Sequence, residues 1–379
     1  MRITSVEVMQ LQVPLKKTYA LSKAYGKLEI TEPIVIKVHT DEGIVGYGEC
    51  EPWPLFTGES VGTTITVLKE IVPAIIGADP CNIWDIHHKM DRVIKGKLQA
   101  KGAIDIACYD ILGKAKNMPV HQILGGKQRE KMPVMWAIGG STPEESAAEV
   151  LAARDAGYQG CMIKIGGNDY KLDAARTIAV REAVGPDFAL NVDANQGWDT
   201  DTAIRYGKLV EKCDLMYFEQ PVKAGDVYGM AKVRRAVDIP ISADEGVITI
   251  QDALHLIKND AADIFSIKVS KNGGIMPARE IINLAKAHGI QIFFNSQIEE
   301  GIAQAASLQM GATTSNLVAM GHAYFSPKRL EADICTYEDQ INVAEGTVSI
   351  LDKPGLGIEL KQDRIDKYLR QKLEIKETK

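Results

Sequence analysis

The sequence lacks long apolar runs. None approaches the roughly 18 residues that a membrane-spanning helix needs, so we expect no membrane partner. The opening residues, MRITSVEVMQLQVP, alternate like a strand and lack the apolar core of a signal peptide. Long basic runs are also missing, and the formal net charge is −6. The chain therefore carries no electrostatic footprint for nucleic acid.

Cysteine is scarce and scattered. Six cysteines occur in 379 residues, and none forms a C-x-x-C pair, which argues against a zinc site. Buried free thiols are typical of proteins in a reducing compartment, so we expect a cytoplasmic protein.

The remaining composition is that of an ordinary globular enzyme, with 45% hydrophobic and 25% charged residues. The length exceeds what one small core requires and suggests two or three domains. A barrel of roughly 200 to 250 residues with a smaller partner domain would account for it.

Residues 1–130 do not share the rhythm of the later chain and are predicted to form an α+β domain of their own. Short alternating runs predict strands, and apolar positions at helical spacing predict helices. The predicted strands cover 2–13, 33–40 and the stretch after the turn TDEG, and the predicted helices cover 59–75, 82–94 and 99–116.

Residues 131–325 alternate regularly between short β-branched runs and helical stretches. Thr142 is the expected N-cap of the first helix, with Pro143 in its first turn and Glu145 completing a capping box. The strand signals are MPVMWAIGG, GCMIKIG, ALNVDAN, LMYFEQP, PISADE, DIFSIKV, QIFFNS and LVAMGH. Continuous runs of this kind suit a parallel sheet buried on both faces. Eight of them with polar ends favour a closed α/β barrel over an open sheet.

Residues 326–379 are predicted to be irregular or strand-like, with a short helix near the end. We expect this segment to pack back on the N-terminal domain. Its final stretch, LRQKLEIKETK, is mixed in sign and is interpreted as a solvated helix end.

Three acids and two lysines stand at nearly even intervals, each at the end of a predicted strand. They are Lys164, Asp193, Glu219, Asp244 and Lys268. The steps between them are 29, 26, 25 and 24 residues, about one strand plus one helix each. Because all strands of a closed barrel end on one rim, these side chains are expected to converge there.

A ring of carboxylates predicts a metal site. One acid at a strand end is commonly a helix cap or a surface charge, but three in register are not explained in that way. Oxygen ligands select a hard cation, so Mg²⁺ is expected first and Mn²⁺ second.

The two lysines interrupt otherwise apolar strands, where a charge is costly unless it is paired or functional. Each could instead extend its ammonium group to the rim or bridge an acid structurally. Burial and a neighbouring metal both lower a lysine's pKa, which would make a neutral amine available as a base. Strands two and six lie on opposite sides of an eight-stranded barrel, so Lys164 and Lys268 would face the two sides of a substrate.

This arrangement suggests abstraction of a proton next to a carboxylate. The second negative charge of the resulting enediolate must be stabilised as it forms, and a divalent metal on the substrate carboxylate can do so. One lysine would take the proton, and the other would return it on the opposite face or stabilise the intermediate.

The motifs resemble those of the enolase superfamily, in the muconate lactonizing enzyme subgroup (mandelate racemase/muconate lactonizing enzyme-like). IKIGG, VDANQGW, EQP, ADE and IKVSKNGGI occur in the family's order and spacing, and the resemblance covers nearly the whole chain. It implies a modified TIM barrel, (β/α)7β, with an N-terminal α+β capping domain completed by the C-terminal segment.

By this resemblance the three acids are Mg²⁺ ligands and the two lysines are the acid/base pair. Asn195 and Glu245 would orient the ligands. The substrate would be a small carboxylate. Homo-oligomers are common in the family, so we expect one here.

Several positions depart from the family pattern. Met162 replaces the first lysine of the K-x-K found in many members. Strand eight reads Gly321-His322-Ala323-Tyr324, where muconate cycloisomerases tend to carry a glutamate and dipeptide epimerases a D-x-D.

The rim instead offers polar side chains that are expected to contact the substrate, although His322 could equally be a packed histidine. Cap loops should close over this rim, from Thr18 to Lys27 and from Glu51 to Phe56. Trp53 and Phe56 could wall the pocket or could belong to an interdomain core. The expected substrate-binding residues are Tyr25, Trp53, Phe56, Asn295, Gln297, Glu299 and His322.

Three functional hypotheses follow from these residues. The first is an isomerase: a racemase or epimerase, or a muconate-type cycloisomerase. The second is a dehydratase of a hydroxy acid or hydroxyproline-like substrate that uses the same intermediate, with a lysine or His322 assisting hydroxide loss. The third is a non-catalytic binding protein, which would have lost ligands that are all present here. An unrelated metal-dependent barrel such as an aldolase fits the spacing but not the motifs.

Overall fold

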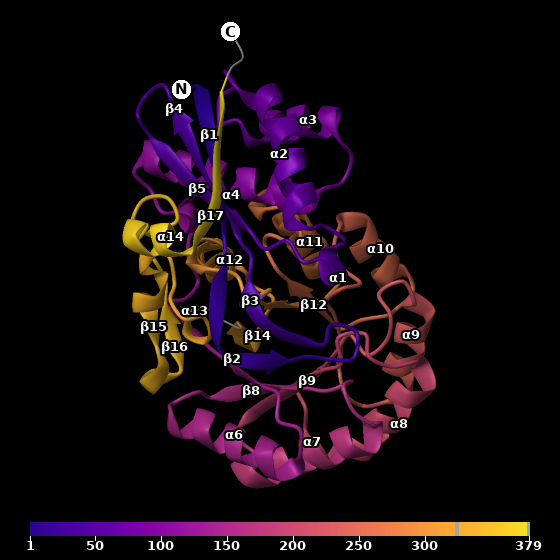
Figure 1. Ribbon diagram of the computed structural model, residues 1–379. Coiled ribbons are helices and arrows are strands. Elements are labelled where there is room, and N and C mark those ends of the chain that lie inside the picture. The colour runs from indigo at the N-terminus through magenta and orange to yellow at the C-terminus, as the bar shows by residue number, and fades with distance from the viewer. Residues whose placement is uncertain (323–325, 377–379) are drawn as a thin grey trace.

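The computed structural model describes residues 1–322 and 326–376. It places an α+β cap over one end of a barrel of parallel strands (Figure 1). Ala323 and Tyr324, part of the strand-eight departure noted above, lie outside the described residues.

The barrel consists of eight strands that pair in parallel with their neighbours in chain order. They are β7 (Trp136–Ile138), β8 (Gly160–Lys164), β9 (Ala189–Asp193), β10 (Phe218–Glu219), β11 (Ile241–Ala243), β12 (Ile264–Ile267), β13 (Gln291–Phe294) and β14 (Leu317–His322). A parallel bridge between Val134 and His322 joins the last strand to the chain entering the first. The expected fold class, a modified TIM barrel with an N-terminal cap, is confirmed.

Seven helices connect consecutive strands and run along the outside of the barrel (Figure 1). They are α6 (Pro143–Asp155), α7 (Tyr170–Val184), α8 (Thr200–Val210, continued by a 3-10 turn at Glu211–Cys213), α9 (Val227–Ala236), α10 (Ile250–Lys258), α11 (Ile275–Ala287) and α12 (Gly301–Thr313). The predicted start of α6 is confirmed, because the Thr142 hydroxyl accepts from the Glu145 N–H and the Glu145 carboxylate caps the Thr142 N–H in return.

The cap is built on an antiparallel sheet in the order β17-β1-β4-β5. Its elements are β1 (Ile3–Leu11), β4 (Ile34–Thr40), β5 (Val45–Cys50), α2 (Val61–Ile75), α3 (Ile83–Val93), α4 (Leu98–Lys116) and α5 (Val120–Ile123), so the predicted strands and helices of this region are confirmed. A second hairpin, β2 (Val13–Ala20) with β3 (Lys27–Thr31), and the short helix α1 (Pro54–Thr57) extend from the cap toward the barrel rim (Figure 1).

Two glycines let helix α4 lie directly on strand β5. A Cβ at Gly48 would stand 1.9 Å from the Ala103 carbonyl oxygen, and one at Gly46 would stand 2.2 Å from that of Ala107. Neither distance is tolerable between non-bonded atoms, so any side chain here would push the helix off the sheet. The sequence VGYGEC therefore sets how closely the cap packs.

The C-terminal segment returns to the cap, as expected, but ends differently. It contains α13 (Ser326–Arg329), two 3-10 turns (Thr336–Gln340 and Val343–Glu345), β15 (Ile341–Asn342), β16 (Thr347–Ser349), α14 (Gln362–Tyr368) and β17 (Leu369–Lys376). Strand β16 pairs with β15 on one side and with β6 (Lys131–Pro133) on the other. The stretch interpreted as a solvated helix end is thus a strand, which corrects that expectation. It alternates half-buried and exposed residues and pairs with β1 from Ser5 to Leu11, because β1 would otherwise present an unpaired edge.

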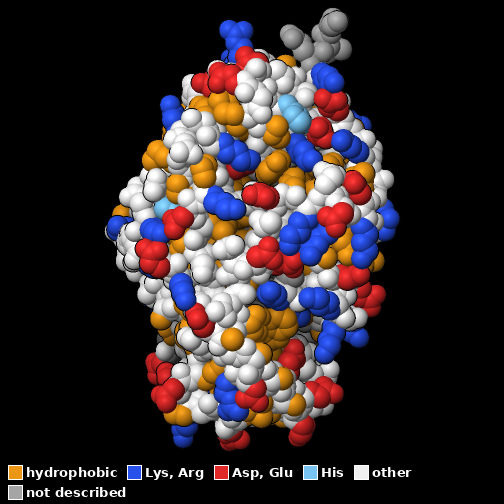
Figure 2. Space-filling model, turned by 90° about the vertical axis from the view of Figure 1, so that its left-hand side faces the viewer, with side chains coloured by type: hydrophobic (Ala, Val, Ile, Leu, Met, Phe, Trp, Pro, Cys, Tyr) orange, Lys and Arg blue, Asp and Glu red, His pale blue; other side chains and the backbone are white. Residues whose placement is uncertain are grey.

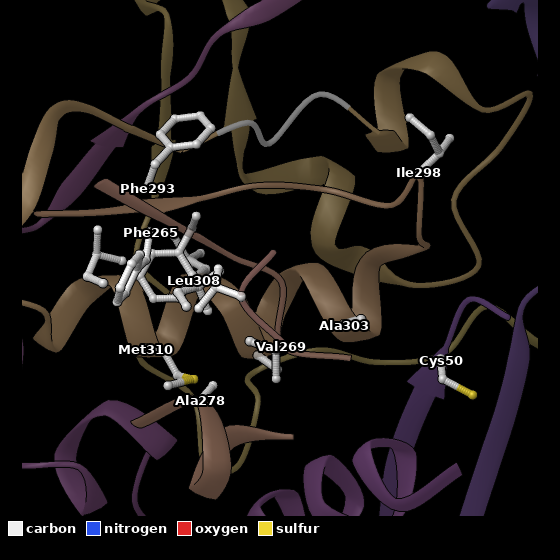
Figure 3. Close-up of a cluster of buried hydrophobic side chains, with 14 of the residues drawn as sticks. Cys50, Phe265, Val269, Ala278, Phe293, Ile298, Ala303, Leu308 and Met310 are labelled. Carbon is white, nitrogen blue, oxygen red and sulfur yellow. The ribbon is translucent and has the colours of Figure 1, made fainter. Parts of the chain in front are cut away.

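The barrel core is filled by aromatic and aliphatic side chains. Phe265 of β12 lies beside Leu308 and Met310 of α12, whereas Phe293 of β13 points to the other face of the sheet; all four side chains are buried (Figure 3). The surface mixes Lys and Arg with Asp and Glu over the face shown in Figure 2. Among the described residues, none of the helices combines the length and apolar character required to cross a bilayer.

Buried acids join the cap to the barrel. Glu49 at the end of β5 accepts the N–H groups of Glu300 and Ala303, at 2.6 and 2.8 Å, and Asp333 accepts that of Gly301 at 2.8 Å. The backbone N–H groups at the start of α12 therefore find acceptors on two segments, Glu49 of the cap domain and Asp333 of the C-terminal segment. Burial raises the pKa of Glu49 to about 8, with Glu299 and Asp333 adding to the effect.

This cluster predicts that stability falls as the pH rises. A carboxyl group whose pKa is about 8 when folded and about 4.5 when unfolded stabilises the fold fully below the lower value, and loses that contribution as the pH rises through the upper one. Between pH 5.5 and 8.5, the melting temperature of the wild type should drop about 5 °C further than that of Glu49→Gln, by calorimetry. Glu182→Gln, at an exposed site, serves as the control and should follow the wild type. Parallel curves for wild type and Glu49→Gln would contradict the assignment.

Candidate active site

The structure brings the five rim residues together. Lys164, Asp193 and Glu219 are the last residues of β8, β9 and β10, while Asp244 and Lys268 directly follow β11 and β12. Strand pairing sets Lys164 beside Asp193 and Asp193 beside Glu219. The three acids are fully buried, and the lysine side chains are 10% and 6% exposed.

Each lysine is paired with an acid of a neighbouring strand. The Lys164 ammonium donates to Asp193 Oδ2, and that of Lys268 to Asp244 Oδ2 at 2.6 Å. Burial alone would lower the pKa of each lysine, but Asp193 for Lys164 and Asp244 for Lys268 outweigh it, so both pKa values are raised. Burial was expected to lower the pKa of these lysines, but in the protein alone the neighbouring carboxylates raise it.

A third lysine, missed in the sequence, shares Asp244. Lys271 donates to Asp244 Oδ1 at 2.8 Å, to the Asp244 carbonyl at 2.7 Å and to the Ser266 carbonyl at 2.9 Å, and it is 1% exposed. It fixes the backbone and the carboxylate of Asp244 at once. Lys271 lies within the motif IKVSKNGGI, which could have marked it as a site residue. A lysine after a strand does not by itself predict which acid it will contact.

Glu219 is the least compensated acid of the group. Its Oε1 accepts from Asn295 at 2.7 Å, while its Oε2 is buried and meets no hydrogen-bond donor among the described residues. Burial first, and then the charges of Asp193 and Asp244, raise the pKa of Glu219 well above its ordinary value. A buried carboxylate oxygen between two other carboxylates fits a bound cation by charge and by ligand chemistry.

The acids do not themselves form a closed metal cage. Among the described residues, no group of three or more His, Cys, Asp or Glu side chains is arranged to hold a metal ion. Asp193 and Asp244 point instead to lysines and, for Asp193, to the N–H of Asn195 at 2.7 Å. A cation bound by Asp193 and Asp244 would compete with these hydrogen bonds.

A network of polar groups ties the cap loop to the acids. Tyr25 donates to Glu245 Oε1 at 2.8 Å and accepts from Gln196 at 2.7 Å, and Asn195 donates to the same Glu245 oxygen at 3.3 Å. Ser22 donates to the Asn195 carbonyl at 3.0 Å. Asn195 and Glu245 thus connect the loop between β2 and β3 with the neighbours of Asp193 and Asp244.

Aromatic side chains from the cap cover the lysines. Tyr25, Trp53 and Phe56 form a cluster with ring centroids 5.3 to 6.0 Å apart, and the Lys268 ammonium lies 4.1 Å from the centre of the Phe56 ring. Both lysines line the small enclosed cavity beneath, about 30 Å³ in volume, which is room for one or two water molecules. The cap is therefore closed over the rim, and the three aromatics wall this cavity, which we name the inner pocket.

Other predicted contact residues take different places. Asn295 lines the inner pocket, but Gln297 and Glu299 do not. Gln297 donates to the Glu51 carbonyl at 3.1 Å, and Glu299 accepts from Gln297, Ser296 and Gln304. They shape the loop after β13 and hold it against the cap.

His322 is also set apart from the inner pocket. It is fully buried and stacked on Phe294, with ring centroids 5.5 Å apart and an angle of 5° between the planes. Burial holds the pKa of its imidazole well below the ordinary value. The packed-histidine interpretation agrees with this placement.

Tyr19 and Leu21, in the predicted cap loop from Thr18 to Lys27, also line the inner pocket, and so do Ser296 and Ile298, which the sequence did not mark. Ile298 has a φ of 66°, a left-handed conformation that a β-branched residue rarely adopts. Such strain concentrates at functional sites, but no sequence pattern marks it in advance.

Removing Lys271 should test the charge balance at Asp244. Lys271→Met would leave part of a buried carboxylate uncompensated, at a cost of about 3 kcal/mol in the free energy of unfolding measured with urea. Lys258→Met, at an exposed position, should change it by less than about 0.5 kcal/mol. Equal stability of the two variants would show that Lys271 does not balance Asp244.

Both the cap and the barrel match models of known protein families. Residues 5–125 match the family described as mandelate racemase / muconate lactonizing enzyme, N-terminal domain, and residues 145–364 match the family described as enolase C-terminal domain-like. The two matches together span most of the chain.

Full-length relatives agree with these matches. N-succinyl-L-Arg/Lys racemase of Bacillus cereus is 37% identical over 371 residues, covering 96% of this chain and 97% of the relative, and its crystal structure superposes with a TM-score of 0.95. Hydrophobic dipeptide epimerase of Enterococcus faecalis is 33% identical over 94% of this chain and 99% of its own.

One solved relative holds a metal and a ligand. A dipeptide epimerase from Cytophaga hutchinsonii, complexed with Mg and the dipeptide D-Ala-L-Val, is 29% identical with a TM-score of 0.92, covering 99% of this chain and all of that one. Cycloisomerases and a hydroxyproline dehydratase are also among the relatives.

Proposed function

The chain belongs to the mandelate racemase / muconate lactonizing enzyme family of the enolase superfamily, and from this premise we propose that it is a racemase or epimerase dependent on a divalent cation. A racemase, an epimerase and a cycloisomerase among its relatives are all isomerases. The reaction would invert the α-carbon of a small carboxylate substrate.

One observation carries this proposal: two buried lysines line the same small pocket from strands on opposite sides of the barrel. Lys164 ends the second barrel strand, and Lys268 directly follows the sixth. The closed pocket has room for only one or two water molecules, so a substrate would have to widen it; an α-carbon held between the lysines would then present its proton to one amine and its opposite face to the other. Catalysis by two positioned amines needs no further side chain for proton transfer.

Asp193, Glu219 and Asp244 would hold the cation, with Mg²⁺ favoured over Mn²⁺ because all three ligands are carboxylates. When bound, it would stabilise the extra negative charge that the substrate carboxylate gains as the α-proton leaves. The buried Glu219 oxygen without a donor supports this assignment, and so does the Mg in the related dipeptide epimerase structure.

The lysines would carry the proton. Because Asp193 and Asp244 raise the pKa values of both lysines in the protein alone, one lysine would first have to lose its proton; its neutral amine would then take the α-proton, and the bonding electron pair would remain on the substrate. The opposing ammonium then gives its proton to the other face, so the product is the mirror configuration at that carbon. Phe56 and Trp53 would exclude water from the closed pocket and so protect the intermediate.

A dehydratase is the alternative, and a hydroxyproline dehydratase relative supports it. In that reaction a lysine would assist the departure of hydroxide after the same proton abstraction. The stacked, buried position of His322 outside the inner pocket argues against it as the assisting acid. In deuterated water an epimerase returns substrate labelled at the α-carbon, whereas a dehydratase yields a 2-keto product.

Glu219→Gln should weaken Mg²⁺ binding. The glutamine can keep the Asn295 hydrogen bond through its oxygen while removing one negative charge, so the dissociation constant measured by calorimetry should rise at least about tenfold. Circular dichroism should show an unchanged fold, and the exposed Glu70→Gln variant should bind as the wild type does. Wild-type affinity in Glu219→Gln would remove Glu219 from the ligand set.

Substituting either lysine should separate proton abstraction from inversion. Lys164→Met and Lys268→Met should each lose racemisation by a factor of about 10³ or more, because the second base is missing. Each variant should still exchange the α-proton for deuterium in one enantiomer, and the two variants should act on opposite enantiomers. The screen covers N-acyl amino acids, dipeptides, proline derivatives and muconates, read by NMR.

Racemisation at the wild-type rate in either lysine variant would exclude the two-base mechanism. Exchange of the same enantiomer by both variants would also contradict it, because the lysines would then lie on one side of the substrate.

A further inference from the structure

The two rim lysines are held in different ways. Lys164 is the last residue of β8, where it is paired with Asp193 of β9, and its carbonyl accepts from Arg176 of α7 at 3.0 Å. Lys268 instead follows the end of β12 and begins a turn over residues 268–274 that leads into α11. We name this turn the Lys268 loop. The place of the Lys268 amine therefore depends on what holds the loop.

Asn272 holds the start of the Lys268 loop within the barrel. Its Oδ1 accepts from the Lys268 N–H at 3.1 Å, and its own N–H donates to the Lys268 carbonyl at 3.0 Å. Its Nδ2 donates to the carbonyls of Val247 and Ile248, at 3.0 and 2.9 Å. Both backbone groups of Lys268 are thus bonded to Asn272, which is bonded in turn to the loop after β11.

The end of the Lys268 loop is held by the cap. Asp105 of α4 is fully buried, and its carboxylate accepts the N–H groups of Ile275 and Met276, at 2.5 and 3.4 Å. These are the first two residues of α11, where a carboxylate also interacts favourably with the helix dipole. The Nε2 atom of His87 in α3 lies 2.7 Å from Asp105 Oδ2. Two cap helices therefore fix the point at which the loop ends.

Two glycines allow helix α4 to lie directly on the Lys268 loop. A Cβ at Gly274, whose φ is 112°, would stand 2.3 Å from Asp105 Cγ. A Cβ at Gly102 of α4 would stand 3.2 Å from the backbone of Gly273 and from the Ser270 carbonyl oxygen. Because packing this close leaves no gap between helix and loop, a shift of α4 displaces the loop as well.

We propose that Asp105 is a positioning residue for Lys268, and that it acts through the Lys268 loop. The cap thereby sets the direction from which the Lys268 amine meets the substrate, whereas Lys164 is positioned by strand pairing and by α7. This inference rests on the proposed function, because that function gives each lysine one of the two proton transfers. A change at Asp105 impairs proton transfer on one face of the substrate and spares the other.

The first test is Asp105→Asn, assayed by α-proton exchange in deuterated water with each enantiomer of a substrate from the screen above. An amide has one acceptor oxygen, so part of the contact with α11 is lost. Exchange of the enantiomer that Lys164→Met still uses should fall at least about tenfold in kcat, with KM within about twofold. Exchange of the enantiomer that Lys268→Met still uses should stay within about twofold. Equal losses for both enantiomers, or no loss for either, would overturn the inference.

Asp110→Asn is the matched control. Asp110 lies on the same helix and is also buried, but its carboxylate accepts the N–H groups of Tyr47 and Leu356, at 3.0 and 2.9 Å. It therefore faces β5 and the C-terminal segment. Asp110→Asn should lower the melting temperature, as Asp105→Asn does, and should leave the ratio of exchange between the two enantiomers as in the wild type. An equal change of this ratio in both variants would contradict a specific role for Asp105.

Gly102→Ala reaches the same loop without removing a hydrogen bond, so it also serves if Asp105→Asn does not fold. Alanine is favoured over glycine inside a helix, while its Cβ presses on Gly273 and Ser270. This variant should show the same loss for one enantiomer alone. Wild-type exchange of both enantiomers would show that contact with α4 does not set the place of Lys268.

Amide hydrogen exchange, read by mass spectrometry, tests the contact without turnover. Residues 268–276 should exchange at least about tenfold faster in Asp105→Asn than in the wild type or in Asp110→Asn. Unchanged protection of this segment would overturn the inference. If the segment exchanges faster as expected while the wild type exchanges no substrate α-proton, the cap does hold the loop and it is the proposed function that fails.

Discussion

The mutual neutralisation of buried charges at the barrel rim is the constraint on which the site depends. Asp244 would be costly in the interior without a cation, and Lys268 and Lys271 would be costly without an anion; both lysines share the one carboxylate of Asp244. Asp193 and Lys164 repeat this pairing on the other side. The two amines proposed to transfer the proton are thus held by the acids proposed to bind the cation, so a change in the charge of one group alters the electrostatic energy of the others.

Much of this arrangement could be predicted from local sequence, because it depends on local signals. Strand runs, the capping box at Thr142 and the position of an acid at the end of each strand are read within one repeat of strand and helix. Once parallel strands close into a barrel, topology alone brings Lys164 and Lys268 to opposite sides. These features required no knowledge of side-chain contacts.

Other features depend on contacts between distant segments and could not be predicted from the sequence. The mixed charges of residues 369–376 predict a solvated helix end, whereas pairing with the open edge of β1 makes this segment a strand. Lys271 and Ile298 gain their roles from a partner on another strand and from backbone strain. Phe56 of the cap lies over Lys268 of the barrel. No pattern within the cap sequence or within the barrel sequence predicts a contact between the two.

The pairing of β17 with β1 has a consequence for synthesis of the chain. The outer strand of the cap sheet is supplied by residues 369–376, so the cap sheet is completed only after the whole barrel has been synthesised. Until then β1 has an open edge that other chains could join. We expect nascent chains to rely on chaperones at this stage, and truncations near the C-terminus to aggregate through a domain more than 300 residues away in sequence.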